Sequence, residues 1–202
     1  SVQKKPRFLF HRKNTEQAHV ILGFPALRRD HPRRYILALL HIILGANMSS
    51  RLYEEIREKR GLAYEIRSGL NFYDDIGSFT ISAGLENSKV EKTLRLIMKE
   101  LSKIYVKGVR RGELKRAKEY LRNQLFFALD DTLDHMLWLG DKAMHFRTIP
   151  SKEKICRNVE GVTPDDIQRM ARKIFKKNKV NFVMIGNVDE KRQERIRDCA
   201  AL

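Results

Sequence analysis

The apolar residues between positions 44 and 72 change their period at one glycine, and this change constrains the fold more than any other feature of the chain. Before Gly61, Met48, Leu52 and Ile56 recur every fourth residue, which predicts a helix with one buried stripe. Gly61 can adopt the left-handed conformation without strain, so we expect it to end that helix. After Gly61, apolar and polar residues alternate, which predicts a strand. Its apolar positions are Leu62, Tyr64, Ile66, Leu70 and Phe72.

The rest of the chain shows the same two periods. Alternation predicts strands at residues 8–10, 18–24 and 79–85, and a short apolar run predicts another at 180–185. Helical spacing predicts helices at residues 35–44, 88–108, 114–128, 131–147, 152–159 and 164–175, while the basic tail at 191–197 is compatible with a short helix or with disorder. The strands on either side of residues 74–75 must pair antiparallel, because their link is too short for a crossover. This order of elements predicts an α+β fold, a two-layer sandwich with helices packed on one face of a mostly antiparallel sheet.

Two helix starts carry capping signals. Ser88 and Glu91 have the spacing of a capping box, and Thr163 precedes a proline and two acidic residues. His41 lies within the apolar helix at 35–44, where we expect a hydrogen-bonded core histidine rather than a metal ligand.

Length and composition indicate one soluble globular domain, which we expect to span residues 1–202. Hydrophobic residues make up 42% and charged residues 33% of the chain, so it is not of the disordered class. The longest apolar run, at residues 35–46, is too short to span a membrane, so we expect no membrane span. The chain begins at Ser1 rather than at a methionine, and we therefore expect a fragment of a longer chain.

Residues 48–64 read Met-Ser-Ser-Arg-Leu-Tyr-Glu-Glu-Ile-Arg-Glu-Lys-Arg-Gly-Leu-Ala-Tyr. This run resembles the signature of the metal-free half of the pitrilysin, insulinase and mitochondrial processing peptidase family of zinc metallopeptidases. The resemblance implies a C-terminal-type, processing-peptidase-like half-domain. It also implies that Arg57 and Tyr64, seven residues apart, lie opposite the zinc, bind the substrate backbone and help to stabilise the transition state. The turn at Gly45, Ala46 and Asn47 becomes a possible peptide-contact turn, although the family's turn is richer in glycine.

Spacing alone favours a plainer interpretation of the same two residues. Arg57 can pair with Glu54 one helical turn earlier, and Tyr64 shares its face with Leu62 and Ile66, as a half-buried core tyrosine would. Only the resemblance favours a role for the pair in a site.

Metal-binding and redox motifs are missing from the sequence. The catalytic half of the family carries H-x-x-E-H, in which two histidines bind zinc and the glutamate activates water, and this chain lacks that motif. Its six histidines are scattered, and Cys156 and Cys199 form no C-x-x-C pair, so we expect two free thiols. We therefore expect no metal, no bound cofactor and no catalytic residue on this chain alone, with zinc in a partner half.

Our leading hypothesis is the substrate-binding, non-zinc half of a zinc metalloendopeptidase that cleaves peptides or unfolded proteins. Its partners would be an extended peptide substrate and a zinc-bearing N-terminal half, in the same polypeptide or in a separate subunit, and it could form a homodimer or heterodimer. A non-catalytic scaffold or peptide-presenting subunit of the same fold remains the alternative. We expect a cytoplasmic location, with an organelle or the periplasm left open should a targeting segment precede Ser1.

A third hypothesis, a nucleic-acid-binding domain, rests on the net charge of +16. Basic residues gather at positions 107–118 and 169–179. Both clusters flank apolar helical stripes and lack interleaved aromatic residues, which favours solvated helix faces. We expect no specific nucleic acid partner.

Overall fold

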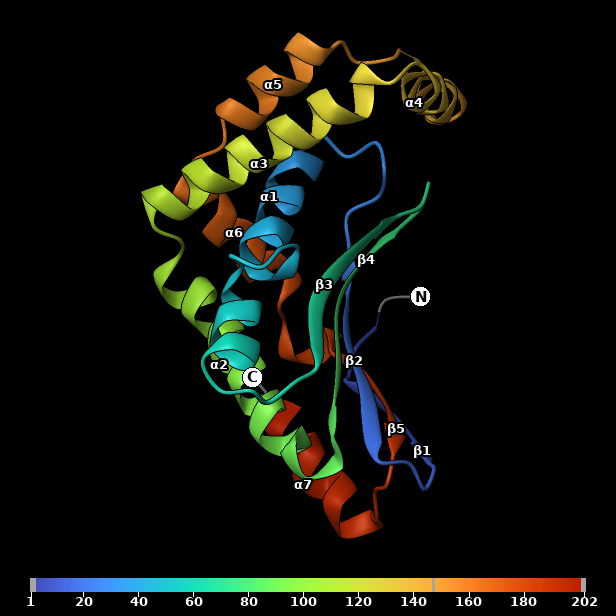
Figure 1. Cartoon of the computed structure of the whole chain (residues 1–202), viewed down its shortest axis with the longest axis vertical. Helices are drawn as coiled ribbons and strands as arrows, with labels where there is room; N and C mark the ends of the chain where they lie inside the picture. The colour runs from blue at the N-terminus through green and yellow to red at the C-terminus, as the bar shows by residue number, and fades with distance from the viewer. Residues whose placement is uncertain (1–2, 147, 201–202) are drawn as a thin grey trace.

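Five strands form one sheet in the order β1-β5-β2-β4-β3 in the computed structural model, which describes residues 3–146 and 148–200 (Figure 1). The strands are β1 (Arg7–Arg12), β2 (Gln17–Ala26), β3 (Glu65–Phe72), β4 (Gly77–Glu86) and β5 (Asn181–Gly186). Only β1 and β5 run parallel, while the other three pairs are antiparallel. The predicted mostly antiparallel sheet is therefore confirmed.

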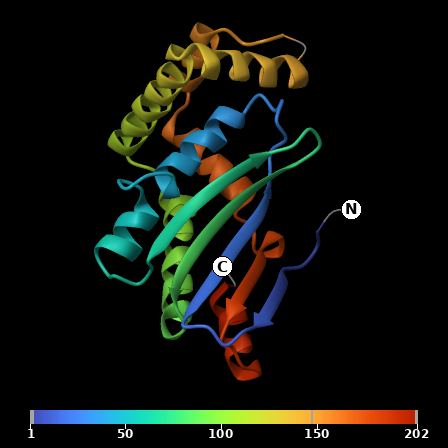
Figure 2. The ribbon, with the colours of Figure 1, turned by 45° about the vertical axis from the view of Figure 1, so that its right-hand side comes forward.

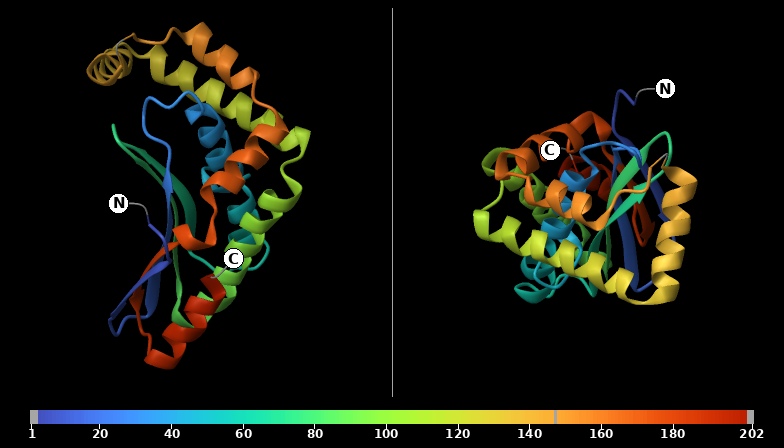
Figure 3. Two further views of the ribbon diagram at one scale, coloured as in Figure 1. Left: turned by 180° about the vertical axis from the view of Figure 1, so that it is seen from behind. Right: turned by 90° about the horizontal axis from the view of Figure 1, so that it is seen from above.

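The helices lie on one face of this sheet, except that α4 extends past the end of the sheet toward the side of its other face (Figure 3). They are α1 (Arg34–Gly45), α2 (Val90–Lys107), α3 (Arg111–Asp130), α4 (Thr132–His145), α5 (Lys152–Glu160), α6 (Pro164–Ile174) and α7 (Glu190–Ala200), with short turns η1 (Tyr53–Glu58), η2 (Asn87–Lys89) and η3 (Lys177–Lys179). Each predicted helix is present, and the basic tail is helical. The predicted end of α4 at residue 147 lies outside the described residues. No helix among the described residues is long and apolar enough to cross a membrane.

Strand β3 begins at Glu65 rather than at Leu62, and β1 and β2 are longer than predicted. The order of the strands in the sheet was not predicted. Strand β5, the last in sequence, lies between β1 and β2, so the first two strands are not paired with each other. Strand β2 continues through Pro25 to Ala26, because its ladder with β4 runs on to Gly77.

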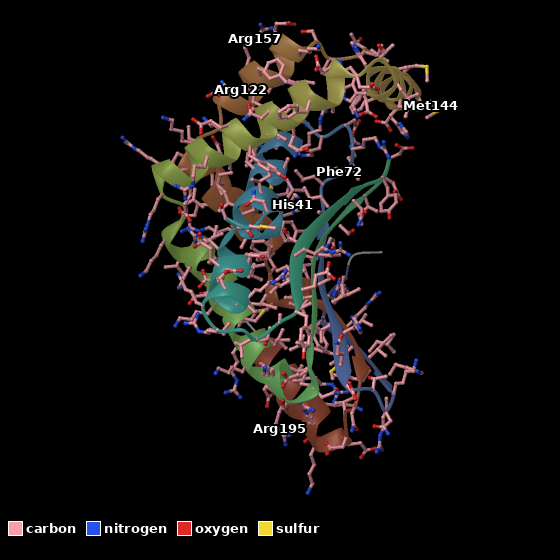
Figure 4. All side chains as sticks on the ribbon, in the orientation of Figure 1. His41, Phe72, Arg122, Met144, Arg157 and Arg195 are labelled. Atoms are coloured by element: carbon pink, nitrogen blue, oxygen red, sulfur yellow. The ribbon has the colours of Figure 1, made fainter. Side chains whose placement is uncertain are left out.

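The core lies between the sheet and α1, α2 and α6, and three phenylalanines mark its centre. Phe79 of β4 and Phe24 of β2 both meet the ring of Phe175 edge-on, with centroids 5.3 and 5.1 Å away. His41 of α1 borders this cluster (Figure 4), and its Nδ1 lies 2.6 Å from the Ser68 hydroxyl. Burial lowers the pKa of His41 to about 4, so the ring is neutral at neutral pH. The prediction of a hydrogen-bonded core histidine is confirmed.

Helix ends follow the sequence signals in three places and depart from them in one. Gly61 and Gly108 take positive φ angles of 56° and 70° where helices end. Thr163 and Asp166 form the predicted capping box, and hydrogen bonds from Thr163 lower the pKa of Asp166 to about 2. The box predicted at Ser88 is wrong. That residue lies in turn η2, and the Glu91 carboxylate instead accepts hydrogen bonds from Arg192.

Candidate functional site

The signature residues form the predicted helix, but its second part, Tyr53–Glu58, is π-helical. The wider winding is seen in the hydrogen bond from the Lys59 amide to the Glu54 carbonyl, five residues back, at 2.9 Å. Leu52 and Ile56 are fully buried, as predicted. Met48 is 74% exposed because it lies in the turn before the helix begins, so its assignment to the buried stripe is wrong. Short π-helical turns are rare and are frequently found at functional sites.

Arg57 is exposed on this π-helical turn and does not pair with Glu54. Its guanidinium lies 5.0 Å from the centre of the Tyr53 ring, and no ion pair to it is found among the described residues. The wider π-helical turn moves Glu54, three positions earlier, away from Arg57 and leaves Tyr53, four positions earlier, as its neighbour. The plainer interpretation of Arg57 is therefore wrong.

Tyr64 is also exposed, with 56% of its surface accessible, so it is not a half-buried core tyrosine. It lies at the bend before β3, where its amide donates a 2.9 Å hydrogen bond to the Gly84 carbonyl of β4. The residues just before it, Leu62 and Ala63, are buried.

The segment between Arg57 and Tyr64 is held by its own backbone. The Gly61 amide donates to the Arg57 carbonyl at 2.9 Å, and the Leu62 amide donates to the Ile56 carbonyl at 3.0 Å. The positive φ of Gly61 turns the chain toward the sheet. The chain therefore presents both side chains to solvent from one short, hydrogen-bonded turn.

An ion pair that sequence analysis did not find anchors the signature helix to α3. The Arg51 guanidinium contacts the Glu113 carboxylate through two hydrogen bonds of 2.7 and 2.8 Å, and the two side chains are 19% and 18% exposed. Glu113 also accepts a 2.8 Å bond from the Arg110 amide at the start of α3. Burial alone would raise the pKa of Glu113, but the bonds from Arg51 and Arg110 outweigh it and lower that pKa.

Glu113→Gln is expected to lower the free energy of unfolding at pH 7 by about 1–2 kcal/mol, because it leaves the partly buried Arg51 charge without its partner. Urea unfolding measures the change, and Glu119→Gln at an exposed position of the same helix is the control. The native pair stabilises the folded protein above pH 4.5, the ordinary glutamate pKa, and this stabilisation is lost as the pH falls below that value. The reason is that the pKa of Glu113 is lower in the folded protein than in the unfolded chain. Equal stability of the two variants would contradict this role of the pair.

The turn predicted to contact peptide is partly a packing feature. Gly45 is buried, and a Cβ atom there would lie 2.6 Å from the Ser68 amide nitrogen, so the glycine allows α1 to approach β3 closely. Asn47 holds the turn itself, since its side-chain oxygen accepts a 3.0 Å bond from the Ser49 amide. Asn47 also borders a surface hollow of about 370 Å³ against α3, whereas Gly45 and Ala46 do not.

The described residues offer no metal site and no disulfide. Residues 3–146 and 148–200 contain no group of three His, Cys, Asp or Glu side chains placed to hold a metal ion. Both cysteines are free. In the basic clusters some side chains have partners within the chain. Arg172 donates to the Tyr105 carbonyl at 3.0 Å and lies over its ring, and Arg169 pairs with Asp166.

Comparisons with known proteins identify the family. Residues 1–121 match the family model described as the peptidase M16 inactive domain. An uncharacterized zinc protease of Streptomyces coelicolor is 35% identical over 189 residues, which cover 94% of this chain and 41% of that protein. One of Bacillus subtilis is 32% identical over 176 residues, covering 85% and 43%. The chain thus spans about four tenths of the length of these relatives.

Solved structures show the same fold. A protease from Helicobacter pylori superposes with a TM-score of 0.84 at 22% identity, over 91% of this chain and 45% of that one. A peptidase M16 inactive domain from Pseudomonas fluorescens gives 0.83 at 24% identity, over 92% and 44%. Because the family model matches more than half of the chain and relatives exceed 30% identity, this chain belongs to the peptidase M16 family, as a C-terminal domain of the inactive type.

Proposed function

We propose that this chain is the substrate-binding, non-zinc half of a zinc metalloendopeptidase that acts on peptides or unfolded proteins. The observation that carries the proposal is the presentation of Arg57 and Tyr64 from one hydrogen-bonded turn, with neither side chain used by the core. The names of the relatives and the share of their length that the chain spans support a second, zinc-bearing half.

The residues of this chain do not fit a zinc ion, since its described part holds no cluster of metal ligands. We therefore place the metal in the other half, in the same polypeptide or in a separate subunit, where zinc would supply an activated water. The part left to this chain is hydrogen bonding. The Arg57 guanidinium would donate to a substrate carbonyl or to the developing oxyanion, and the Tyr64 hydroxyl would donate a second bond.

The test is turnover of an unfolded protein by the assembled peptidase, with Arg57→Ala and Tyr64→Phe combined in this half. Lost turnover with unchanged zinc content supports the proposal. Native turnover in the double variant contradicts it, and peptide binding without turnover in the native assembly would instead favour the scaffold or peptide-presenting subunit.

A further inference from the structure

A groove of about 680 Å³ opens at the end of β3 that is farther from Tyr64. Its walls come from α1, the end of β3, α3, α4 and the residues that follow α4. Figure 2 shows α3 and α4 at this end of the molecule, above the tip of the hairpin formed by β3 and β4, and Figure 4 places Phe72 below α4. At the rise of an extended strand, the eight residues of β3 separate the groove from Tyr64 by about 26 Å.

The walls of the groove are apolar. The side chains that matter most are Tyr35 of α1, Leu70 and Phe72 of β3, Leu125 of α3, Trp138 of α4, and Phe146. All of them are only partly buried, so their exposed surface is available to a ligand. A groove of this size and character would bury one or two bulky apolar side chains.

Every charged side chain that lines the groove is a cation. Arg34 lies between two rings, with its guanidinium carbon 4.6 Å from the centre of Tyr35 and 4.7 Å from that of Phe146. Lys142 lies 5.8 Å from the centre of the same Phe146 ring. The two cations therefore converge on one side of the groove.

These cations are unequally neutralised. Lys142 and Arg29 both contact Asp141, at 2.6 and 3.0 Å, whereas no carboxylate within the described residues lies within ion-pair distance of Arg34. The Arg29 Nε atom is buried without a hydrogen-bond partner in the same part of the chain, since Asp74 lies 3.7 Å away, too far for a hydrogen bond. Arg34 donates a 2.8 Å hydrogen bond to the Tyr35 hydroxyl and has no carboxylate partner among the described residues, so it is the cation of the groove that is left to bind an anion.

We propose that this groove binds the carboxy-terminal residue of a peptide, with a bulky apolar side chain between the rings and the free carboxylate on Arg34 and Lys142. The apolar walls select the side chain, and the cations select the charge. The choice of a peptide among apolar anions rests on the function proposed above. About eight extended residues would span the distance from Tyr64 to the groove.

The probe is an unstructured peptide of about four residues that ends in phenylalanine with a free carboxylate, because at the rise of an extended strand it is too short to reach Tyr64 from the groove. Trp138 is the only tryptophan of the chain, so its fluorescence reports ligand in the groove, and calorimetry gives the affinity. Amidation of the carboxylate is expected to weaken binding about 10-fold or more, because a charge-assisted contact is lost. Glycine in place of the terminal phenylalanine is expected to weaken binding by about the same factor.

Arg34→Gln is expected to abolish the preference for the free acid over the amide. Arg33→Gln is the matched control, since Arg33 is exposed, adjacent in sequence and not part of the groove, and should keep the preference. The peptide comparisons leave the protein unchanged, so a folding defect cannot imitate their result. Equal binding of acid and amide, a preference that survives Arg34→Gln, or no binding at all would overturn the proposal.

Two further binding experiments test whether the groove binds something other than a peptide. Decanoate that binds as tightly as the peptide would indicate an acyl-chain site and overturn the peptide assignment. Loss of peptide binding when the chain is joined to its zinc-bearing half would identify the groove as part of the contact between halves, and would also overturn it.

The Arg57→Ala, Tyr64→Phe double variant separates this proposal from the proposed function. It should bind the peptide in the groove as the native chain does, while turnover by the assembled peptidase is lost. If groove binding is absent but turnover depends on Arg57 and Tyr64, only the groove proposal fails. If the peptide binds in the groove but turnover does not depend on Arg57 and Tyr64, the groove proposal holds and the proposed function is wrong.

Discussion

Replacing Arg57 by alanine and Tyr64 by phenylalanine is expected to lower the kcat of the assembled peptidase by about 10- to 1000-fold, the range seen when oxyanion donors are removed from other enzymes. Both substitutions remove a hydrogen-bond donor and leave the turn around Gly61 intact, because its bonds are between backbone groups. If the two donors act only on the transition state, kcat and kcat/KM fall by the same factor. If they also hold the ground-state substrate, KM rises as well.

Stability should change little in this variant, which keeps the kinetic result interpretable. Both side chains are exposed, and the contact of Arg57 with the Tyr53 ring contributes about 0.5–1 kcal/mol at most. Arg157→Ala combined with Tyr105→Phe removes an exposed arginine of α5 and a phenolic hydroxyl elsewhere on the surface. This control should keep native turnover. A similar loss of turnover in both double variants would show that the effect is not specific to the turn.

Local periodicity predicted the elements well because it reports which face of a segment is buried. The switch of period at Gly61, the α+β layers and the antiparallel pairing of β3 with β4 all follow from residues close together in sequence. The position of β5 between β1 and β2 could not be predicted in this way. The sequence of an apolar strand does not indicate which strands it pairs with. The parallel partner of β5, β1, also lies at the opposite end of the chain.

In the candidate site too, features formed by residues close in sequence could be predicted, and features formed by residues far apart could not. Arg57 and Tyr64 were found through one continuous motif at residues 48–64, whereas the pair of Arg51 and Glu113 joins residues 62 positions apart. The groove was missed because segments far apart in the sequence, from Arg29 to Ile155, contribute its walls. One signal was available: apolar residues occur on several sides of α4, more than one buried stripe requires, and Figure 4 shows Met144 at the outer end of the molecule.

Phe79→Ala is expected to lower the free energy of unfolding by about 3–5 kcal/mol, which is a large share of the 5–15 kcal/mol typical of a domain. Phe79 is fully buried near the start of β4, opposite Phe24 in one neighbouring strand and Leu70 in the other. Its ring also meets Phe175, which follows α6, and His41 of α1. No single neighbour can move into the space, since two strands and two helical segments would have to shift together.

The matched control is Phe127→Ala, the same chemical change at a side chain that is 77% exposed on α3. It should alter stability by no more than about 0.5 kcal/mol, because little packing is lost. Urea unfolding followed by circular dichroism measures both variants, and an unchanged slope with denaturant shows that the unfolding reaction is the same. A loss at Phe79 below about 1 kcal/mol would mean that the core can collapse around the missing ring, contrary to close packing between the sheet and its helices. A loss of about 3–5 kcal/mol would show that the Phe79 cluster is closely packed against α1, the helix that precedes the turn presenting Arg57 and Tyr64.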